Sequence, residues 1–450
     1  MIGTRPYPRV YTANLQGLCL IFEIRTLLAF RLNYNEAMIK LLHFADAHID
    51  MTNFGAHDPK TGLPVRVMDF LKSLDVIVQT AIDEKVDLVI FAGDAYKDRS
   101  PAPTFQREWG RRIMRLSDAG IPTILLTGNH DISPSQRKAH AMQEFDTLQP
   151  AHIRVVSNLK LLRSEDLEGL PIQVLAIPWI TRSGVMQTVT SEESEEADPL
   201  KVMESAVSDW INDALEACDP NLPVILTAHA SIFGATFGNE QEIKIGRDVV
   251  LPLGMVTKPK IDYVALGHIH KYQDLNVGLH PPVVYPGSIE RVDFGEVKED
   301  KGFIIANVEK GKTTYEWRKL PIRKFVDRSV TLEDELNVNE KLIAALPPQE
   351  ELKDAIVRLR INYPQGYEVL IDEALLMNYA KEAFEFKLQK NPTSKARSRL
   401  GDNEETSSLN PLQLLELFWK EKHEEAAEID RLKSLAGNLI NQLEQGDDAE

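Results

Sequence analysis

The sequence predicts an α/β protein with layered sheets, built as more than one domain. From residue 38 onward, short apolar runs typical of buried strands alternate with longer amphipathic stretches typical of helices. Polar residues directly follow several of these strands, at the end where open α/β folds place their ligand sites. A chain of 450 residues exceeds what one core usually holds, so two or three domains are expected.

Composition sets the first limits on function. A hydrophobic content of 43% with interspersed charge is typical of a soluble globular protein. The two cysteines, Cys19 and Cys218, cannot build a disulfide framework or a thiolate zinc site, so a cytoplasmic protein is expected. The net charge of -17 argues against non-specific polyanion binding by the whole surface, although bound cations can reverse the field at one site.

The chain begins with a segment that precedes the first expected strand. Residues 15–31 are apolar, but Glu23 and Arg25 interrupt them and no small-residue cleavage site follows. Neither a secretion signal nor a membrane span is therefore expected. Because Met38 opens a natural first strand, residues 1–37 are interpreted as an N-terminal extension from an early start codon. A helical appendage is the alternative.

A first large domain is expected at 38–320. Its predicted strands lie at 39–44, 87–92, 122–127, 172–177, 223–228, 262–266 and 282–285. Its predicted helices lie near 65–83, 104–119, 134–145 and 195–217. Gly311-Lys312-Thr313 resembles the end of a phosphate-binding P-loop, but Ala306 stands at the position of the required earlier glycine, so no ATPase is expected. A hairpin turn is predicted at EKGK, 309–312.

Five of the predicted strands end in side chains that can hold a metal ion. In chain order these are Asp46 and His48, Asp94, Asn129 with His130 and Asp131, His229, and His268 with His270. Carboxylates, imidazoles and one amide oxygen suit divalent ions such as Mn²⁺, Fe²⁺ or Zn²⁺. Any one of them alone is more simply a turn, a cap or a surface residue. Together, at five successive strand ends, they favour a dinuclear metal site.

This ordered series, D-x-H, G-D, G-N-H-D, a strand-end histidine and G-H-x-H, resembles the calcineurin-like metallophosphoesterase superfamily. The resemblance implies a four-layer α/β/β/α domain that holds two divalent metal ions, with Mn²⁺ the expected ion. Carried over by position, it implies Asp94 as a bridge between the ions. The other implied ligands are Asp46, His48 and His270 for the first ion and Asn129, His229 and His268 for the second.

Residues next to these ligands are expected to take part in the reaction. His130 is placed to protonate the leaving oxygen or to stabilise the transition state. Asp131 is expected either to orient the His130 ring or to cap a helix that begins near Pro134. The sequence also departs from the family pattern. Lys97 stands where some members carry a second functional histidine and could contact a phosphate as a point charge, and Asp50 stands where they often carry glycine.

Two segments narrow the resemblance to one family. YPGSIERVDFGE at 285–296 and GDAYKDRSPAP at 93–103 closely resemble the nuclease subunits of SbcCD exonuclease complexes. This resemblance, strongest before about residue 325, implies a DNA exonuclease and endonuclease that acts on single- and double-stranded DNA ends. It makes Arg291 a candidate for contact with a DNA phosphate. A turn and strand that close the sheet are the plainer role of 285–296.

The rest of the chain predicts a smaller module and a helical tail. Predicted strands at 325–332, 355–363 and 384–389 alternate with helices near 333–345 and 371–380, which indicates a small α+β domain at 321–390. The resemblance implies that this is a capping domain that helps to choose the DNA substrate; a plain packing domain is the alternative. Residues 391–411 are polar and indicate a flexible linker.

Residues 412–450 carry an amphipathic helical pattern, as two helices or as one interrupted near Glu424. The resemblance implies that 412–443 dock an SbcC-type ATPase, with the nuclease as a homodimer inside a heterotetramer. A helix that folds back on the capping domain is the alternative. Two other functions remain open: a phosphodiesterase or phosphatase of the same fold that acts on small molecules, and a catalytically weak scaffold for the ATPase.

Overall fold

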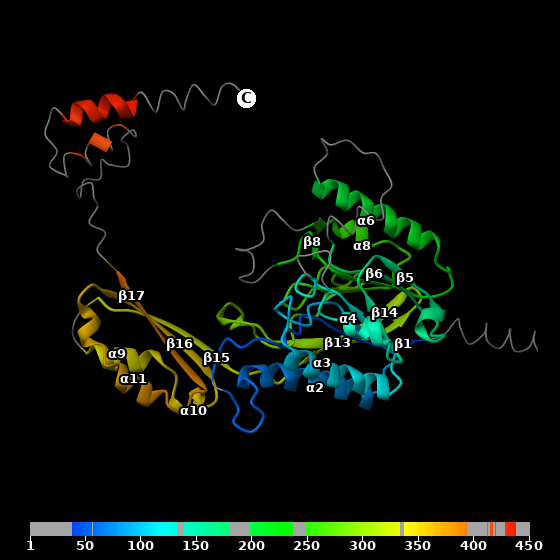
Figure 1. Cartoon of the computed structure of the whole chain (residues 1–450), viewed down its shortest axis with the longest axis horizontal. Helices are drawn as coiled ribbons and strands as arrows, with labels where there is room; N and C mark the ends of the chain where they lie inside the picture. The colour runs from blue at the N-terminus through cyan, green and yellow to red at the C-terminus, as the bar shows by residue number, and fades with distance from the viewer. Residues whose placement is uncertain are drawn as a thin grey trace, which may run out of the picture. The chain divides into compact units, whose positions relative to one another are not determined.

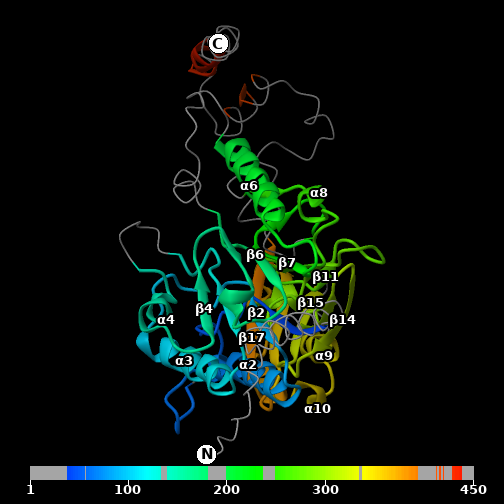
Figure 2. The same cartoon turned by 90° about the vertical axis from the view of Figure 1, so that its right-hand side faces the viewer.

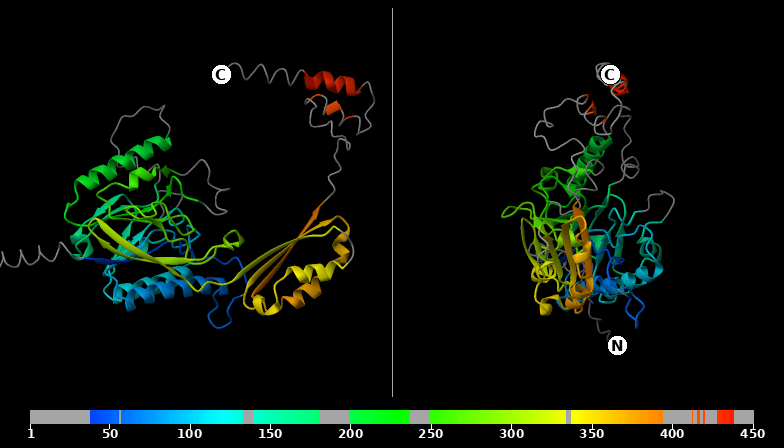
Figure 3. Two further views of the ribbon diagram at one scale, coloured as in Figure 1. Left: turned by 180° about the vertical axis from the view of Figure 1, so that it is seen from behind. Right: turned by 90° about the vertical axis from the view of Figure 1, so that its left-hand side faces the viewer.

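The computed structural model of the protein contains two compact units, Met1–Phe325 and Val326–Glu450 (Figures 1 to 3). The structure describes residues 38–55, 57–132, 139–180, 199–236, 249–333, 337–393, 412, 415–416, 419 and 428–437. The expected N-terminal extension, 1–37, lies outside these residues. The division falls later than the expected boundary at 320 because the Phe325 ring packs edge-on against Phe54 and Phe294 of the first unit.

Two six-stranded sheets form the centre of the first unit, in the orders β14-β13-β1-β2-β3-β4 and β11-β12-β10-β7-β6-β5. The first sheet contains β1 Ile39–Phe44, β2 Leu88–Phe91, β3 Thr123–Leu126, β4 Ile153–Val156, β13 Gly302–Glu309 and β14 Lys312–Lys319. The second contains β5 Lys160–Leu162, β6 Gln173–Ile177, β7 Val224–His229, β10 Tyr263–Gly267, β11 Gln273–Asp274 and β12 Val283–Tyr285. A separate pair joins β8 Ser231–Ile232 and β9 Val250–Leu251.

Helices cover the outer faces of both sheets (Figure 1). They are α2 Val65–Asp83, α3 Pro103–Asp118, α4 Gln143–Leu148, α6 Pro199–Glu216 and α8 Leu253–Val256, with short 3-10 turns η1 Ser164–Leu167 and η2 Phe294–Glu296. Apolar side chains of α2 recur every three or four residues and share one core with α3 and the first sheet. Another core joins α6 and α8 to the second sheet, and a third fills the space between the sheets. The expected four-layer α/β/β/α order is confirmed.

The central strands are parallel, which explains why their sequences are almost continuously apolar. β1 to β4 pair in parallel in the first sheet, as do β6, β7, β10 and β12 in the second. Their carboxyl ends therefore meet along one edge of each sheet. The hairpin predicted at 309–312 is confirmed, because β13 and β14 pair antiparallel on either side of Gly311, whose φ is 75°.

One predicted helix starts later than expected. The prediction placed it at 134–145, but residues 139–142 are not helical and α4 begins at Gln143. Residues 133–138, including the expected start near Pro134, lie outside the described part of the chain. The helix is short because Gln149 adopts a left-handed conformation, with φ of 47°, directly after Leu148.

The second unit is a small α+β module. Its sheet has the order β15-β16-β17, with β15 Phe325–Thr331, β16 Ile356–Pro364 and β17 Glu385–Thr393. Its helices are α9 Val338–Ala345, α10 Gln349–Leu352 and α11 Glu373–Tyr379, with a 3-10 turn η3 Tyr367–Leu370. Alternate residues of β16, such as Leu359 and Ile361, form the core with α9 and α11. The expected linker start at 391 is wrong, because β17 continues in register with β16 to Thr393.

The expected C-terminal helices are described only in part. Residues 412, 415, 416, 419 and 428–437 are helical, and the predicted interruption near Glu424 lies outside the described residues, as does most of the linker. The Lys433 ammonium bonds the Glu416 carboxylate, so the two helical stretches touch. Among the helices that the structure describes, none is long and apolar enough to cross a membrane.

Candidate metal centre

The polar residues of the five strand ends come together at one place in the first unit. Among the described residues, two groups of side chains could each hold a metal ion: Asp46, His48 and His270, and Asp46, Asp94 and His229. The candidate donor atoms of each group lie within 4.8 Å of one another. The two groups share Asp46, whose carboxylate also accepts the His268 backbone amide, with 3.1 Å to each oxygen. Residues distant in sequence thus build one site.

The first group presents two imidazole nitrogens to the same point. His48 Nε2 lies 3.0 Å from His270 Nε2. The opposite nitrogens face acceptors: His48 Nδ1 is 3.2 Å from the Tyr96 carbonyl oxygen, and His270 Nδ1 is 2.8 Å from Glu296 Oε1. Both rings therefore carry their proton on Nδ1, which turns two nitrogen lone pairs toward each other. A shared cation fits this arrangement, because nitrogens about 2.1 Å from one ion lie roughly 3 Å apart.

Further donors meet around Asn129, next to His229 of the second group. The Asn129 side-chain oxygen lies 3.1 Å from His229 Nε2 and 3.0 Å from His268 Nδ1. His229 Nδ1 donates to the Ala92 carbonyl at 2.7 Å, so its Nε2 faces inward. Asp94 Oδ2, which belongs to the second group, approaches one ring of each group: it lies 3.4 Å from His229 Nε2 and 3.9 Å from His48 Nε2.

Buried charge gives a second reason to expect cations here. Asp46, Asp94 and Asp131 are all buried. Burial and the nearby Asp94 carboxylate raise the pKa of Asp131 to about 7. Burial and the neighbouring His270 ring lower the pKa of His48 well below its ordinary value, which keeps this ring neutral and able to bind metal. The donor set therefore suits a pair of divalent ions.

The backbone of the site adopts conformations that side chains rarely accept. Asp46, His48, Asp94 and His268 have φ values of 52°, 38°, 64° and 98°. Glycines let the strand ends approach each other: a Cβ on Gly128 would lie 2.1 Å from Asp94 Oδ1. The surrounding packing must therefore hold the site in place.

The contacts of Asp131 indicate a role in addition to the two expected for it, and the expected helix start near Pro134 lies outside the described residues. Its Oδ2 accepts the amides of Asp94 and Gly128, both at 2.8 Å, and its Oδ1 accepts that of Ala95 at 3.0 Å. The His130 ring is oriented by the Lys97 carbonyl, 2.7 Å from Nδ1. Asp131 thus supports the backbone around Asp94, because its two oxygens are directed at amides from two loops.

Glu296 is a functional candidate that the sequence alone does not single out. It lies at the end of YPGSIERVDFGE, where its carboxylate faces His270 Nδ1 and also binds the buried Lys301 ammonium at 3.0 Å. A buried carboxylate behind a candidate metal ligand orients the ring and increases its basicity. The available signal in the sequence was an acidic residue near the end of a family-specific segment.

Arg291, the candidate for contact with a DNA phosphate, has backbone partners within the protein. Its guanidinium donates hydrogen bonds to three backbone carbonyls, those of Glu296, Glu299 and Arg323, at 2.9 to 3.2 Å. It thus closes the turn that follows β12, the plainer role expected for this segment.

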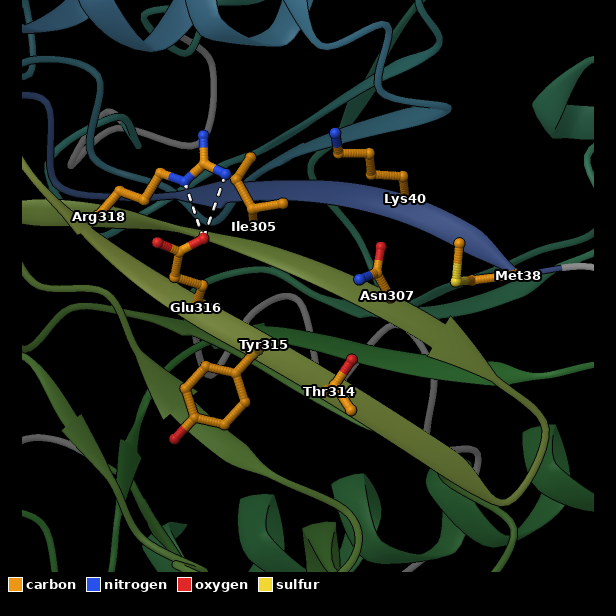
Figure 4. A pocket seen from close by; sticks show the side chains of 8 residues that line it. All are labelled: Met38, Lys40, Ile305, Asn307, Thr314, Tyr315, Glu316 and Arg318. Atoms are coloured by element: carbon orange, nitrogen blue, oxygen red, sulfur yellow. Dashed lines mark hydrogen bonds and ion pairs between the residues drawn. The ribbon is translucent and has the colours of Figure 1, made fainter.

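A hollow of about 390 Å³ lies on the first sheet, between β1, β13 and β14 (Figure 4). Its basic residues already have acidic partners: Lys40 pairs with Glu84 at 2.7 Å, and Arg318 with Glu316 at 3.2 Å. It opens near the amino end of β1, whereas Asp46 follows the carboxyl end. The hollow is therefore separate from the candidate metal centre.

Two known proteins are similar in sequence to this chain. The DNA double-strand break repair protein Mre11 of Methanosarcina acetivorans is 24% identical over 361 residues, 77% of this chain and 50% of the relative. The SbcD subunit of the SbcCD nuclease of Escherichia coli is 26% identical over 285 residues, 61% of this chain and 66% of the relative. The chain thus spans half to about two thirds of these relatives.

The family match covers the strands that carry the candidate ligands. The family model described as calcineurin-like phosphoesterase matches residues 39–272, which include every strand end of the metal centre from Asp46 to His270. The sheets, the clustered donors and this match over more than half of the sequence agree: the chain belongs to the calcineurin-like phosphoesterase family.

Proposed function

We propose that this protein is a dinuclear-metal-dependent DNA nuclease subunit, which hydrolyses phosphodiester bonds at DNA ends together with an SbcC-type ATPase. The observation that carries the proposal is the convergence of nitrogen and oxygen donors from five strand ends in a phosphoesterase fold. The DNA substrate rests on the resemblance of 285–296 to SbcD-type nucleases and on relatives named for DNA repair and for the SbcCD nuclease. In this proposal the subunit works in repair and recombination as a homodimer within a heterotetramer.

The contacts support a division of the ligands between two ions. Asp46, His48 and His270 would hold the first, and Asn129, His229 and His268 the second. Asp94 would bridge them, since its carboxylate lies between His48 and His229. Two such ions supply a nucleophilic oxygen from water and neutralise charge on the phosphate. Mn²⁺ suits this mixed oxygen and nitrogen set.

His130 is the proposed proton donor. Hydrolysis forms one bond from a water oxygen to phosphorus and breaks the bond from phosphorus to the leaving oxygen, which then needs a proton. Because His130 Nδ1 is directed at the Lys97 carbonyl, transfer must use Nε2. The His130 backbone amide donates to Asp94 Oδ1 at 2.9 Å, which supports its position beside the candidate bridging carboxylate.

The test is digestion of linear duplex DNA with Mn²⁺, with and without the cognate ATPase. We expect end-dependent cleavage by the wild-type protein. We expect the His130→Ala variant to bind two equivalents of Mn²⁺ but to cleave about 10²- to 10⁴-fold more slowly. Hydrolysis of bis-p-nitrophenyl phosphate without DNA cleavage in either condition would instead indicate a small-molecule phosphodiesterase. Metal loss in the His130→Ala variant would show that this residue is a ligand.

A further inference from the structure

We propose that Asp50 is a positioning residue that orients His48 and His130 together through two consecutive peptide units. The inference rests on the proposed function, because it assigns Asp50 to the proton donor and to one candidate ligand of that centre. The carboxylate lies on the loop after β1, and its two oxygens accept two successive amides of the loop after β2: Oδ1 that of Lys97 at 2.5 Å, and Oδ2 that of Asp98 at 2.9 Å.

Each of these amides belongs to a peptide unit whose carbonyl binds an imidazole. The Lys97 amide shares a planar peptide with the Tyr96 carbonyl, which lies 3.2 Å from His48 Nδ1. The Asp98 amide shares the next peptide with the Lys97 carbonyl, which lies 2.7 Å from His130 Nδ1. In a trans peptide the N–H and the C=O point in opposite directions, so each unit connects one Asp50 oxygen to one ring.

This arrangement determines which nitrogen each ring presents. A carbonyl held in front of Nδ1 keeps the proton there, so Nε2 faces the site in both rings. A negative charge at the far end of each peptide polarises the unit and strengthens the bond from its carbonyl to the ring. The start of the loop is held by Asp131, which accepts the amides of Asp94 and Ala95. Asp50 therefore controls the later part, which carries the two acceptor carbonyls.

The simpler alternative is that Asp50 only stabilises a surface loop. Substrates whose leaving groups differ in acidity distinguish this role from the proposed positioning role. A p-nitrophenolate leaves without protonation, whereas a DNA alkoxide needs a proton from His130. With saturating Mn²⁺, Asp50→Ala should lower kcat on linear DNA by about 10²-fold and kcat on bis-p-nitrophenyl phosphate by less than about threefold, with KM little changed. Asp50→Asn has one acceptor oxygen and should be intermediate.

Metal binding by the protein without substrate gives a second readout. Because His48 is a candidate ligand, Asp50→Ala should weaken one of the two Mn²⁺ equivalents by about 10- to 100-fold and spare the other. The matched control is Asp58→Ala, which removes a nearby carboxylate that accepts the Thr61 amide at 3.0 Å. This control should behave like the wild type in both assays.

A double-variant cycle separates failure of the inference from failure of the proposed function. If Asp50 acts on proton transfer through His130, the double variant that carries both Asp50→Ala and His130→Ala should cleave DNA no more slowly than His130→Ala alone. Additive losses, or equal losses on both substrates, would overturn the inference. If the wild-type protein hydrolyses bis-p-nitrophenyl phosphate but cleaves no DNA, the proposed function fails instead, whatever Asp50→Ala does. DNA cleavage by His130→Ala at the wild-type rate would overturn the proton-donor role of His130 and with it the inference.

Discussion

At the scale of single residues, the candidate metal centre depends on acceptors behind the imidazoles. Carbonyls take this place behind His48 and His229, whereas Glu296 takes it behind His270. Burial raises the pKa of Glu296, but the Lys301 ammonium and the His270 ring lower it on balance to about 2. The carboxylate therefore stays charged and keeps its partners over the whole neutral range.

Replacing Glu296 with glutamine tests this support. The carboxylate serves three donors, His270 Nδ1, the Val292 amide and Lys301 Nζ, whereas glutamine offers one acceptor oxygen. We expect Glu296→Gln to weaken one of two Mn²⁺ equivalents by about 10- to 100-fold, measured by calorimetry. The free energy of unfolding should fall by about 1–3 kcal/mol at neutral pH, measured with urea.

The lowered pKa of Glu296 predicts how the stability of the fold depends on pH. An acid with a folded-state pKa of about 2 and an ordinary value of 4.5 stabilises the fold above about pH 4.5 and loses this effect as the pH falls toward 2. The stability difference between wild type and Glu296→Gln should therefore shrink from pH 6 to pH 3. Glu299→Gln is the matched control, because Glu299 binds the same Lys301 ammonium at 2.9 Å, whereas the His270 ring is bonded by Glu296. Equal metal loss in both variants would contradict the role of Glu296.

At the scale of secondary structure elements, the glycines after the strands determine how closely the loops approach. The Cβ of Gly128→Ala would meet Asp94 Oδ1 at 2.1 Å and the Asp94 amide nitrogen at 2.6 Å, and backbone cannot yield easily. We expect this variant to lose Mn²⁺ binding and hydrolysis of bis-p-nitrophenyl phosphate while its circular dichroism stays that of the wild type. Gly254→Ala, in α8 with open space around it, should keep both properties.

The elements themselves were largely predictable from the sequence. α2 spans 65–83 as predicted, because its apolar residues follow the helical period without interruption. Buried parallel strands such as β1 were also predicted, since their apolar runs are bounded by polar loops. The start of α4 was not, because a short six-residue helix makes few periodic contacts.

The candidate metal ligands were predictable from the sequence, whereas the residues that hold them in position were not. Strand ends collect at one edge of each sheet, so donors at strand ends, such as Asp46 and Asp94 in the first sheet and His229 in the second, could be expected to form a site. Asp50 and Glu296 act through contacts with backbone amides and with a distant ring, and the sequence does not reveal which amide a carboxylate will meet. The amide contacts of Asp131 were not predicted for the same reason.

At the scale of the whole molecule, the proposed partnership with an ATPase concerns the C-terminal helical stretch. Ile429 is buried, whereas Leu435 is 52% exposed in the same stretch. An exposed leucine on an amphipathic helix is suited to a partner helix. Deleting residues 411–450 should abolish co-purification with the cognate SbcC-type ATPase and spare hydrolysis of bis-p-nitrophenyl phosphate.

A point variant refines the same test. Leu435→Asp should lower recovery of the ATPase at least tenfold, because a charge would be buried in the interface. Leu375→Asp is the matched control, since Leu375 is 39% exposed on α11 of the same unit. Survival of the complex after the deletion would contradict docking through this segment.

The left-handed backbone at Asp46, His48, Asp94 and His268 has a consequence for attempts to improve the protein. Each position would be easier to fold with glycine, so a variant library screened only for heat resistance should accumulate glycine there and lose the metal centre. Natural selection for activity therefore favours the present residues at these four positions, whereas laboratory selection for heat resistance favours glycine. Any engineering campaign should leave them unchanged and seek its gains in the helical layers.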